Sequence, residues 1–124
     1  MTKGRAMALP EDQEGRLQCY RNALANWNVT DYITFGKDAL RWLRVELPQY
    51  SARELARLLY TFVRDGGRID EQVETRPEWD IHPFHYDLRV RIEGRLVYFE
   101  TRLICDDPDD PDDPVIYVVN AHDA

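Results

Sequence analysis

The feature of this sequence that most constrains its fold is a stretch of alternating side chains from Phe84 to Ile104, interrupted once by Glu93-Gly94. Apolar and polar residues alternate on both sides of this pair, which is the pattern of β-strands that bury one face. A pair of this kind between two such runs fits the two-residue turn of a β-hairpin. The sequence therefore predicts an antiparallel hairpin, and its turn fixes the register of both strands.

Counting outward from this turn assigns each side chain to one of two faces. With this turn, Ile92 stands opposite Arg95. A shift of one residue in the strand register would move every side chain of a strand to the opposite face of the sheet. The face expected to contact the core pairs Val90 with Val97, Leu88 with Phe99 and Tyr86 with Thr101. The other face pairs Arg91 with Leu96, Arg89 with Tyr98, Asp87 with Glu100 and His85 with Arg102.

Three helices are expected before the hairpin. Apolar residues at helical spacing predict the first over about 11–27 and the second from Thr30 or Asp31 to the residue before Pro48, with Gly36 as a weak point inside it. The third begins at the capping box Ser51-Ala-Arg-Glu54 and ends before Gly66-Gly67, which suits a left-handed cap. Residues 1–10 show no periodic pattern and are expected to form a flexible tail.

The remaining strands complete the expected fold. A short edge strand is predicted over 72–75, a loop over 77–83 and a final strand over 115–121. Between the hairpin and the final strand, three Asp-Asp-Pro units are expected to form an extended, solvated connection. We therefore expect one α+β domain over 11–124, with the N-terminal helices packed on one face of a small antiparallel β-meander.

Composition limits the classes of function. The chain has 124 residues and a net charge of −7, which as a whole disfavours attraction to phosphate backbones. The acidic excess is uneven, however, because six aspartates fall within 105–114 while arginines crowd the hairpin before it. No apolar run reaches the ~20 residues that cross a bilayer, and no secretory signal is visible. We expect a cytoplasmic protein without a cofactor or metal. Cys19 and Cys105 leave a disulfide open.

The polar face of the predicted hairpin carries the candidate chemistry. His85, Arg89, Tyr98, Glu100 and Arg102 all point to this side, and Asn120 and His122 of the final strand share a face that pairing could bring beside Glu100 and Arg102. Histidine and glutamate can move protons, and arginine can stabilise charge on a phosphate. These are the groups needed to cleave RNA without a metal ion.

An ordinary structural explanation competes with this hypothesis. Solvent-facing sheet surfaces are normally polar, and cross-strand Arg–Glu or Arg–Tyr pairs stabilise a sheet by up to ~1 kcal/mol each. The like-charge pair of Asp87 and Glu100 favours a functional face, unless Arg89 and Arg102 flank it. Trp79, in the expected loop, is assigned to the core.

The element order adds a resemblance. A helix followed by Gly-Gly and a strand, the hairpin YDLRVRIEGRLVYFETRL and a closing strand VIYVVNAH resemble the RelE/MqsR-type interferase toxins over residues 51–122. These belong to the wider barnase, EndoU and colicin group of metal-independent ribonucleases. The resemblance implies RNA as the substrate and His85, Arg89, Tyr98, Glu100, Arg102 and His122 as site residues. The chain departs from such toxins in being acidic, and its first two expected helices have no counterpart there.

Two functions of different classes follow from these observations. The first is a small, metal-independent, toxin-type ribonuclease that acts through the polar sheet face. The second is a non-catalytic protein-interaction domain, in which the arginine-rich face and the acidic loop bind a partner protein.

Overall fold

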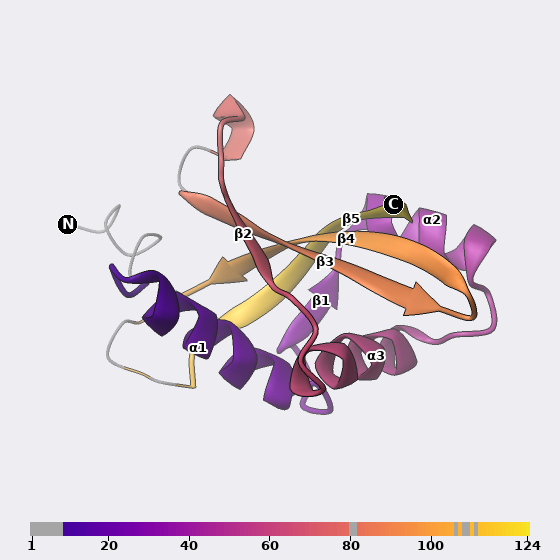
Figure 1. Cartoon of the computed structure of the whole chain (residues 1–124), viewed down its shortest axis with the longest axis horizontal. Coiled ribbons are helices and arrows are strands. Elements are labelled where there is room, and N and C mark those ends of the chain that lie inside the picture. Colours follow the sequence, from indigo (N-terminus) through magenta and orange to yellow (C-terminus); the bar gives the residue numbers. More distant parts are fainter. Residues whose placement is uncertain (1–8, 80–81, 106, 108–109, 111) are drawn as a thin grey trace.

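The computed structural model describes residues 9–79, 82–105, 107, 110 and 112–124. Figure 1 shows helices packed around a twisted sheet. The elements are α1 (Gln13–Ala25), β1 (Ile33–Phe35), α2 (Lys37–Glu46), α3 (Ala52–Arg64), β2 (Asp70–Val73), the 3₁₀ helix η2 (Pro77–Trp79), β3 (Phe84–Ile92), β4 (Arg95–Ile104) and β5 (Val115–Asp123). The strand order in the sheet is β1-β5-β4-β3-β2.

The predicted hairpin and its register are confirmed. Glu93 and Gly94 both have positive φ, 51° and 80°, as a two-residue turn that follows the twist of the strands requires. β3 and β4 pair from Ile92–Arg95 to Tyr86–Thr101, and every pair in this range is the one counted from the turn. The core face and the polar face of the hairpin are therefore those that the sequence predicts.

The third predicted helix is also confirmed. Ser51 caps α3 through its side chain, which accepts from the backbone N–H of Glu54 at 3.1 Å, and the Glu54 carboxylate accepts from Ser51 N–H at 2.8 Å. At the other end Gly66 has φ +96°, and Gly67 N–H donates to the carbonyl of Phe62 at 2.8 Å. These bonds close the helix as a glycine cap does.

The predicted second helix is wrong in its first part. Residues 33–35 form β1, which pairs in parallel with β5, and the helix begins only at Lys37. Gly36 is the N-cap of α2 rather than a weak point within it, and its N–H donates to the carbonyl of Val118 at 2.8 Å. A Cβ at Gly36 would meet the hydroxyl of Tyr117, so a larger residue there would require the Tyr117 ring to move. The sheet therefore has a parallel edge strand that the expected meander lacks.

One apolar core lies between the helices and the sheet. The buried side chains include Tyr20 and Leu24 of α1, Leu43 of α2 and Leu59 of α3, all in one cluster with Leu88 of β3. The three helices cover the face of the sheet that carries these strand residues, so the predicted α+β class, with N-terminal helices on one sheet face, is confirmed. The opposite face of the sheet is left for the polar side chains.

Smaller predictions differ from the structure at their boundaries. The edge strand lies at 70–73 rather than 72–75, the expected loop includes η2, and the last strand extends to Asp123. Most of the expected tail lies outside the described residues, but Leu9 packs against the core. In the Asp-Asp-Pro tract, Asp110 N–H donates to the carbonyl of Asp107 at 3.2 Å and Asp113 N–H to that of Asp110 at 3.1 Å, and the other residues of the expected extended connection lie partly outside the described residues.

Two further findings concern the cysteines and the membrane. Cys19 and Cys105 are both free thiols, Cys19 half-buried and Cys105 buried. Burial raises the pKa of both thiols, for Cys105 to about 11. Within the part of the chain that the structure describes, no helix has the length and apolar character to span a membrane.

Candidate functional site

The polar face is ordered in rows that run across β3, β4 and β5. Tyr98 lies between Arg89 on β3 and His122 on β5, and Glu100 lies between Asp87 and Asn120. A bulge between Glu100 and Thr101 then shifts the register, so that the next residue of the face, Arg102, stands opposite Tyr117. The pairing of the final strand thus brings Asn120, rather than His122, directly beside Glu100.

The row at Tyr98 forms a stack of three side chains. The rings of Tyr98 and His122 have centroids 4.6 Å apart, and the guanidinium carbon of Arg89 lies 5.2 Å from the Tyr98 ring centroid. Arg89 and His122 are exposed, and Tyr98 is half-buried. Burial and the neighbouring Asp87 carboxylate raise the pKa of Tyr98 above its usual value. This row is therefore an accessible surface with a cation, a protonated phenol and an imidazole.

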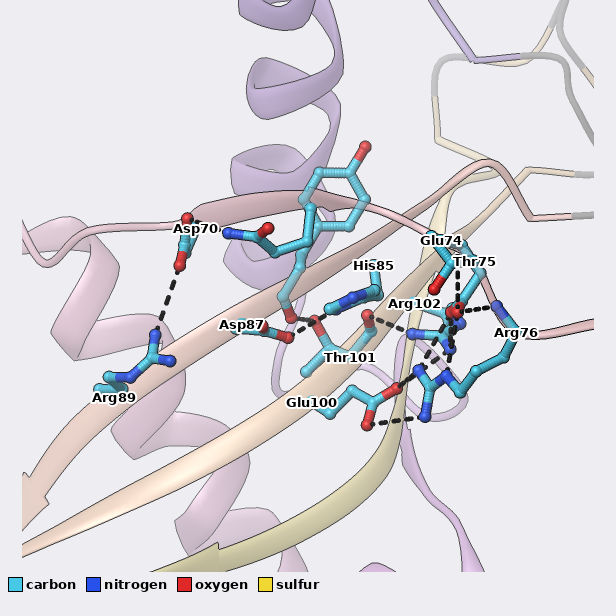
Figure 2. A network of polar contacts seen from close by, with 12 residues as sticks. Asp70, Glu74, Thr75, Arg76, His85, Asp87, Arg89, Glu100, Thr101 and Arg102 are labelled. Carbon is cyan, nitrogen blue, oxygen red and sulfur yellow. Dashed lines mark hydrogen bonds and ion pairs between the residues drawn. The ribbon is translucent and has the colours of Figure 1, made fainter. Parts of the chain in front are cut away.

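A second part of the face holds a network of paired charges (Figure 2). Arg102 binds Glu74 in a short ion pair and Glu100 at 3.0 Å. Arg76 binds Glu74 at 2.9 Å and Glu100 in a second short ion pair. The network therefore alternates two guanidinium groups with two carboxylates, and its formal charges cancel. We call these four residues, Glu74, Arg76, Glu100 and Arg102, the charge network.

The side chains of three of the four residues of the charge network are buried, and that of Arg76 is 40% exposed. The Arg102 side chain is 0% exposed, and the Trp79 ring of η2 lies over its guanidinium at 4.5 Å. Hydrogen bonds from Arg76 and the charge of Arg102 lower the pKa of Glu74 to about 2. The pKa of His82, after η2, is lowered by burial and by the charge of Arg102. The segment between β2 and β3 thus covers the charge network.

His85 lies beside the charge network and is held by one carboxylate. Its Nδ1 lies 2.8 Å from Oδ1 of Asp87, and both side chains are mostly buried. When Nδ1 carries the proton and donates it to Asp87, Nε2 is left as a proton acceptor. Figure 2 shows the imidazole on the same side of the sheet as Glu100, as the predicted turn requires. This pair provides an oriented base.

The six predicted site residues do not converge on one point. His85 lies on β3, two residues before Asp87, which is the partner of Glu100. His122 lies on β5 opposite Tyr98, which is two residues before Glu100 on β4. The two histidines are therefore four residues apart along the strands and two strands apart across the sheet. At ~3.4 Å per residue and ~4.8 Å per strand, the two backbones are about 16 Å apart. His85 and His122 are too far apart to act on the same bond. The face instead divides into the Arg89–Tyr98–His122 row, the His85–Asp87 pair and the charge network.

Several residues of this face were not predicted as site residues. Glu74 lies within the expected edge strand and Arg76 just beyond it. Trp79 was assigned to the core but covers Arg102 instead. The alternation of Asp70, Gln72 and Glu74 was a usable signal, because it continues the polar side of the neighbouring strand. The positions of Arg76 and Trp79 come from a loop path that the sequence pattern does not specify.

No family model, no curated protein and no solved structure matches this chain. Among the described residues, no group of three or more His, Cys, Asp or Glu side chains has the arrangement of a metal site. The geometry of the polar face is therefore the basis on which a function can be assigned.

Proposed function

We propose that the protein is a metal-independent ribonuclease of the cytoplasm that uses the polar face, with His85 as its base and the accessible row of Arg89, Tyr98 and His122 as its RNA-binding surface. The single observation that carries this proposal is the His85–Asp87 pair, with Nδ1 and Oδ1 at 2.8 Å, on the same sheet face as Arg89 and Tyr98. A histidine whose tautomer is set by a carboxylate is an effective general base near neutral pH. The resemblance of the element order to RelE/MqsR-type toxins supports RNA as the substrate class.

The reaction uses the 2′-hydroxyl of RNA as its nucleophile. Nε2 of His85 takes the 2′-hydroxyl proton, the 2′ oxygen forms a bond to phosphorus, and the bond from phosphorus to the 5′ oxygen breaks. The leaving 5′ oxygen takes a proton from water, and protonated His85 returns its proton to solvent. The products are a 2′,3′-cyclic phosphate and a free 5′-hydroxyl. No oxidant, reductant or metal ion is required.

The Arg89–Tyr98–His122 row would bind the RNA strand away from the scissile phosphate, because Arg89 lies four residues, about 14 Å, along β3 from His85. Arg89 pairs with Asp70 at 3.4 Å, and the Arg89 side chain is 50% exposed. An exposed ion pair of this kind contributes little free energy, so an RNA phosphate can displace Asp70 from Arg89. Tyr98 and His122 offer ring faces on which an unpaired base can stack. Glu100 and Arg102 are assigned positioning roles, because both are engaged in the charge network.

The test is cleavage of a fluorescent single-stranded RNA by purified protein in the presence of EDTA. His85→Gln is expected to lower the cleavage rate at least about 100-fold, because a positioned general base contributes roughly that much. The matched control is His82→Gln, a histidine that lies beside the covered charge network and outside the proposed base. It is expected to keep wild-type activity. Circular dichroism and urea unfolding verify that both variants fold.

Two results would contradict the ribonuclease. The first is the absence of cleavage by wild-type protein over a panel of RNA sequences. The second is equal activity of wild-type and His85→Gln protein, which would indicate a contaminating nuclease. Detection of 3′-phosphate or 2′,3′-cyclic ends by mass spectrometry further distinguishes this mechanism from metal-dependent hydrolysis.

A protein-interaction domain is the second candidate, and the pairing of charges favours it. Arg76, Arg89 and Arg102 each pair with a carboxylate of the same face, which leaves little unpaired positive charge to hold RNA. The net charge of −7 adds a repulsive field for a polyanion. A partner protein with its own mixture of charges would not encounter this barrier. A wild-type protein that folds but cleaves no RNA would favour the protein-interaction domain.

A further inference from the structure

The outer edge of β3 is only partly covered. β2 pairs with β3 from Phe84 to Asp87, whereas β3 continues to Ile92. β2 is the last strand on this side of the sheet, so residues 88–92 have no neighbouring strand there in the described chain. Figure 1 shows this end of β3 extending past β2 toward the hairpin turn. At ~3.4 Å per residue the uncovered edge is about 17 Å long.

The hairpin turn determines which backbone groups of this edge point outward. The two residues that flank a two-residue turn exchange hydrogen bonds, and the residues between successive bonded pairs direct their N–H and C=O groups away from the partner strand. Ile92 and Arg95 flank the turn, so Arg91 and Arg89 are the residues that point outward. Among the described loops, no backbone hydrogen bond reaches either residue. The edge therefore offers two donors and two acceptors.

A groove of about 610 Å³ lies along the same edge. α3 and the glycine pair after it line one side with Leu58, Phe62 and Gly67, and the hairpin lines the other with Arg91 and Leu96. Leu96 is 37% exposed, so part of its apolar side chain faces solvent. The groove thus combines apolar walls with an unpaired strand edge.

The charge of the groove is positive. Arg91 is exposed and takes part in none of the ion pairs between described residues, although its Nη1 donates to the carbonyl of Gly94 at 3.2 Å. Arg89 has only its exposed pair with Asp70. Asp65, the acidic residue of the lining, is paired with Arg64 at 3.0 Å. An acidic occupant would therefore find uncompensated positive charge beside the strand edge.

We infer that this edge is a docking site for an extended, acidic segment of a partner protein, which adds a strand to the sheet beside residues 88–92. Side chains of an added strand alternate between the two faces. On one face, apolar side chains of the segment contact Leu58 and Phe62 of α3. On the other face, its carboxylates meet Arg89 and Arg91. The inference does not depend on the proposed ribonuclease activity.

The same charges disfavour a second copy of this chain as the occupant. Two β3 edges that pair with each other would bring the arginines of both copies to the same interface. Like charges across paired strands are destabilising. Arginine at an exposed edge also protects a sheet from pairing with itself, so an acidic segment is the matched partner.

The test uses a fluorescein-labelled peptide of about ten residues with alternating valine and glutamate, and measures its binding by fluorescence anisotropy. We expect saturable binding in the micromolar range. Arg91→Glu should weaken it at least about tenfold, and Arg91→Lys should retain most of it. The same peptide with N-methyl groups on alternate residues should bind at least about tenfold more weakly, because it lacks the strand hydrogen bonds.

Three outcomes would overturn the inference. The first is no saturable binding of the peptide up to millimolar concentration. The second is binding that N-methylation leaves unchanged, which would indicate attraction without strand addition, or binding that Arg91→Glu leaves unchanged, which would show that the positive charge of the edge does not select the occupant. The third is a wild-type dimer in analytical ultracentrifugation that Arg91→Glu disrupts, which would make a second copy the occupant. RNA cleavage by these variants is measured in parallel, so that failure of the docking site and of the ribonuclease are seen separately.

Discussion

Two regions of one sheet face carry the same kinds of residue and differ in what surrounds them. In the charge network, Arg102 is fully buried beneath Trp79, and its charge is satisfied by Glu74 and Glu100. In the Arg89–Tyr98–His122 row, the guanidinium lies over an aromatic ring but remains half exposed. The comparison teaches that arginine and glutamate on a sheet face do not by themselves indicate a site. The segment between β2 and β3 covers one part of the face, and the residues beneath it serve the stability of the fold rather than binding.

The largest effect expected on stability comes from Arg102→Met. Removing this guanidinium leaves Glu74 and Glu100 buried with only Arg76 to balance them. We expect a loss of about 3–5 kcal/mol in the free energy of unfolding, measured by urea denaturation, as for other broken buried ion pairs. Adding Glu74→Gln should recover part of the loss, because it removes one uncompensated carboxylate. A loss below ~1 kcal/mol would mean that the two regions do not differ.

Acid provides the second test of the charge network. Glu74 has a pKa of about 2 in the folded protein against an ordinary 4.5. A lowered folded pKa contributes stability that is fully present above pH 4.5 and is lost as the pH falls through 2. At 1.36 kcal/mol per pKa unit the contribution is on the order of 3 kcal/mol. Wild-type protein should therefore lose that much more stability than Glu74→Gln between pH 5 and pH 2. Parallel pH profiles of the two proteins would contradict this assignment.

Uncovering the charge network should have a smaller effect. Trp79→Ala removes the ring over Arg102, and we expect a loss of about 1–2 kcal/mol, as for a partly desolvated cation–π contact. Arg102 should then become reactive toward phenylglyoxal, which peptide mass spectrometry detects. The matched control is Trp27→Ala, where the neighbouring Arg53 is already exposed. Failure to label Arg102 in the Trp79 variant would show that something other than this ring protects it.

The smallest effect on stability is expected at the open row. Arg89→Met breaks an exposed pair with Asp70 and should change the free energy of unfolding by no more than about 0.5 kcal/mol. The same variant should reduce RNA cleavage, because it removes a cation that the proposed ribonuclease would use to bind the RNA backbone. A large loss in the free energy of unfolding of Arg89→Met would show that Arg89 stabilises the fold as Arg102 does. The open row and the charge network would then not differ.

Much of the polar face was predictable because strand alternation is a local property. The pair Glu93-Gly94 set the register, and the register placed His85 and Glu100 on one side of the sheet. Residues 33–35 were predicted as helix because the helical spacing of apolar residues continues through them. They form a strand instead, because they pair with β5, which is distant in sequence. Strand alternation also could not place His122, because the bulge beside Thr101 shifts the pairing of the last strand.

The hairpin, the third helix and the face to which each hairpin side chain belongs could all be predicted from the amino-acid sequence. Backbone turns and caps depend on a few neighbouring residues, so their signals are contained in short stretches of chain. The burial of Arg102 under Trp79, the exposure of Arg89 and the separation of His85 from His122 became visible only in the folded chain. Burial and distance depend on how remote segments pack, and no local pattern encodes the path of the segment between β2 and β3 across the sheet.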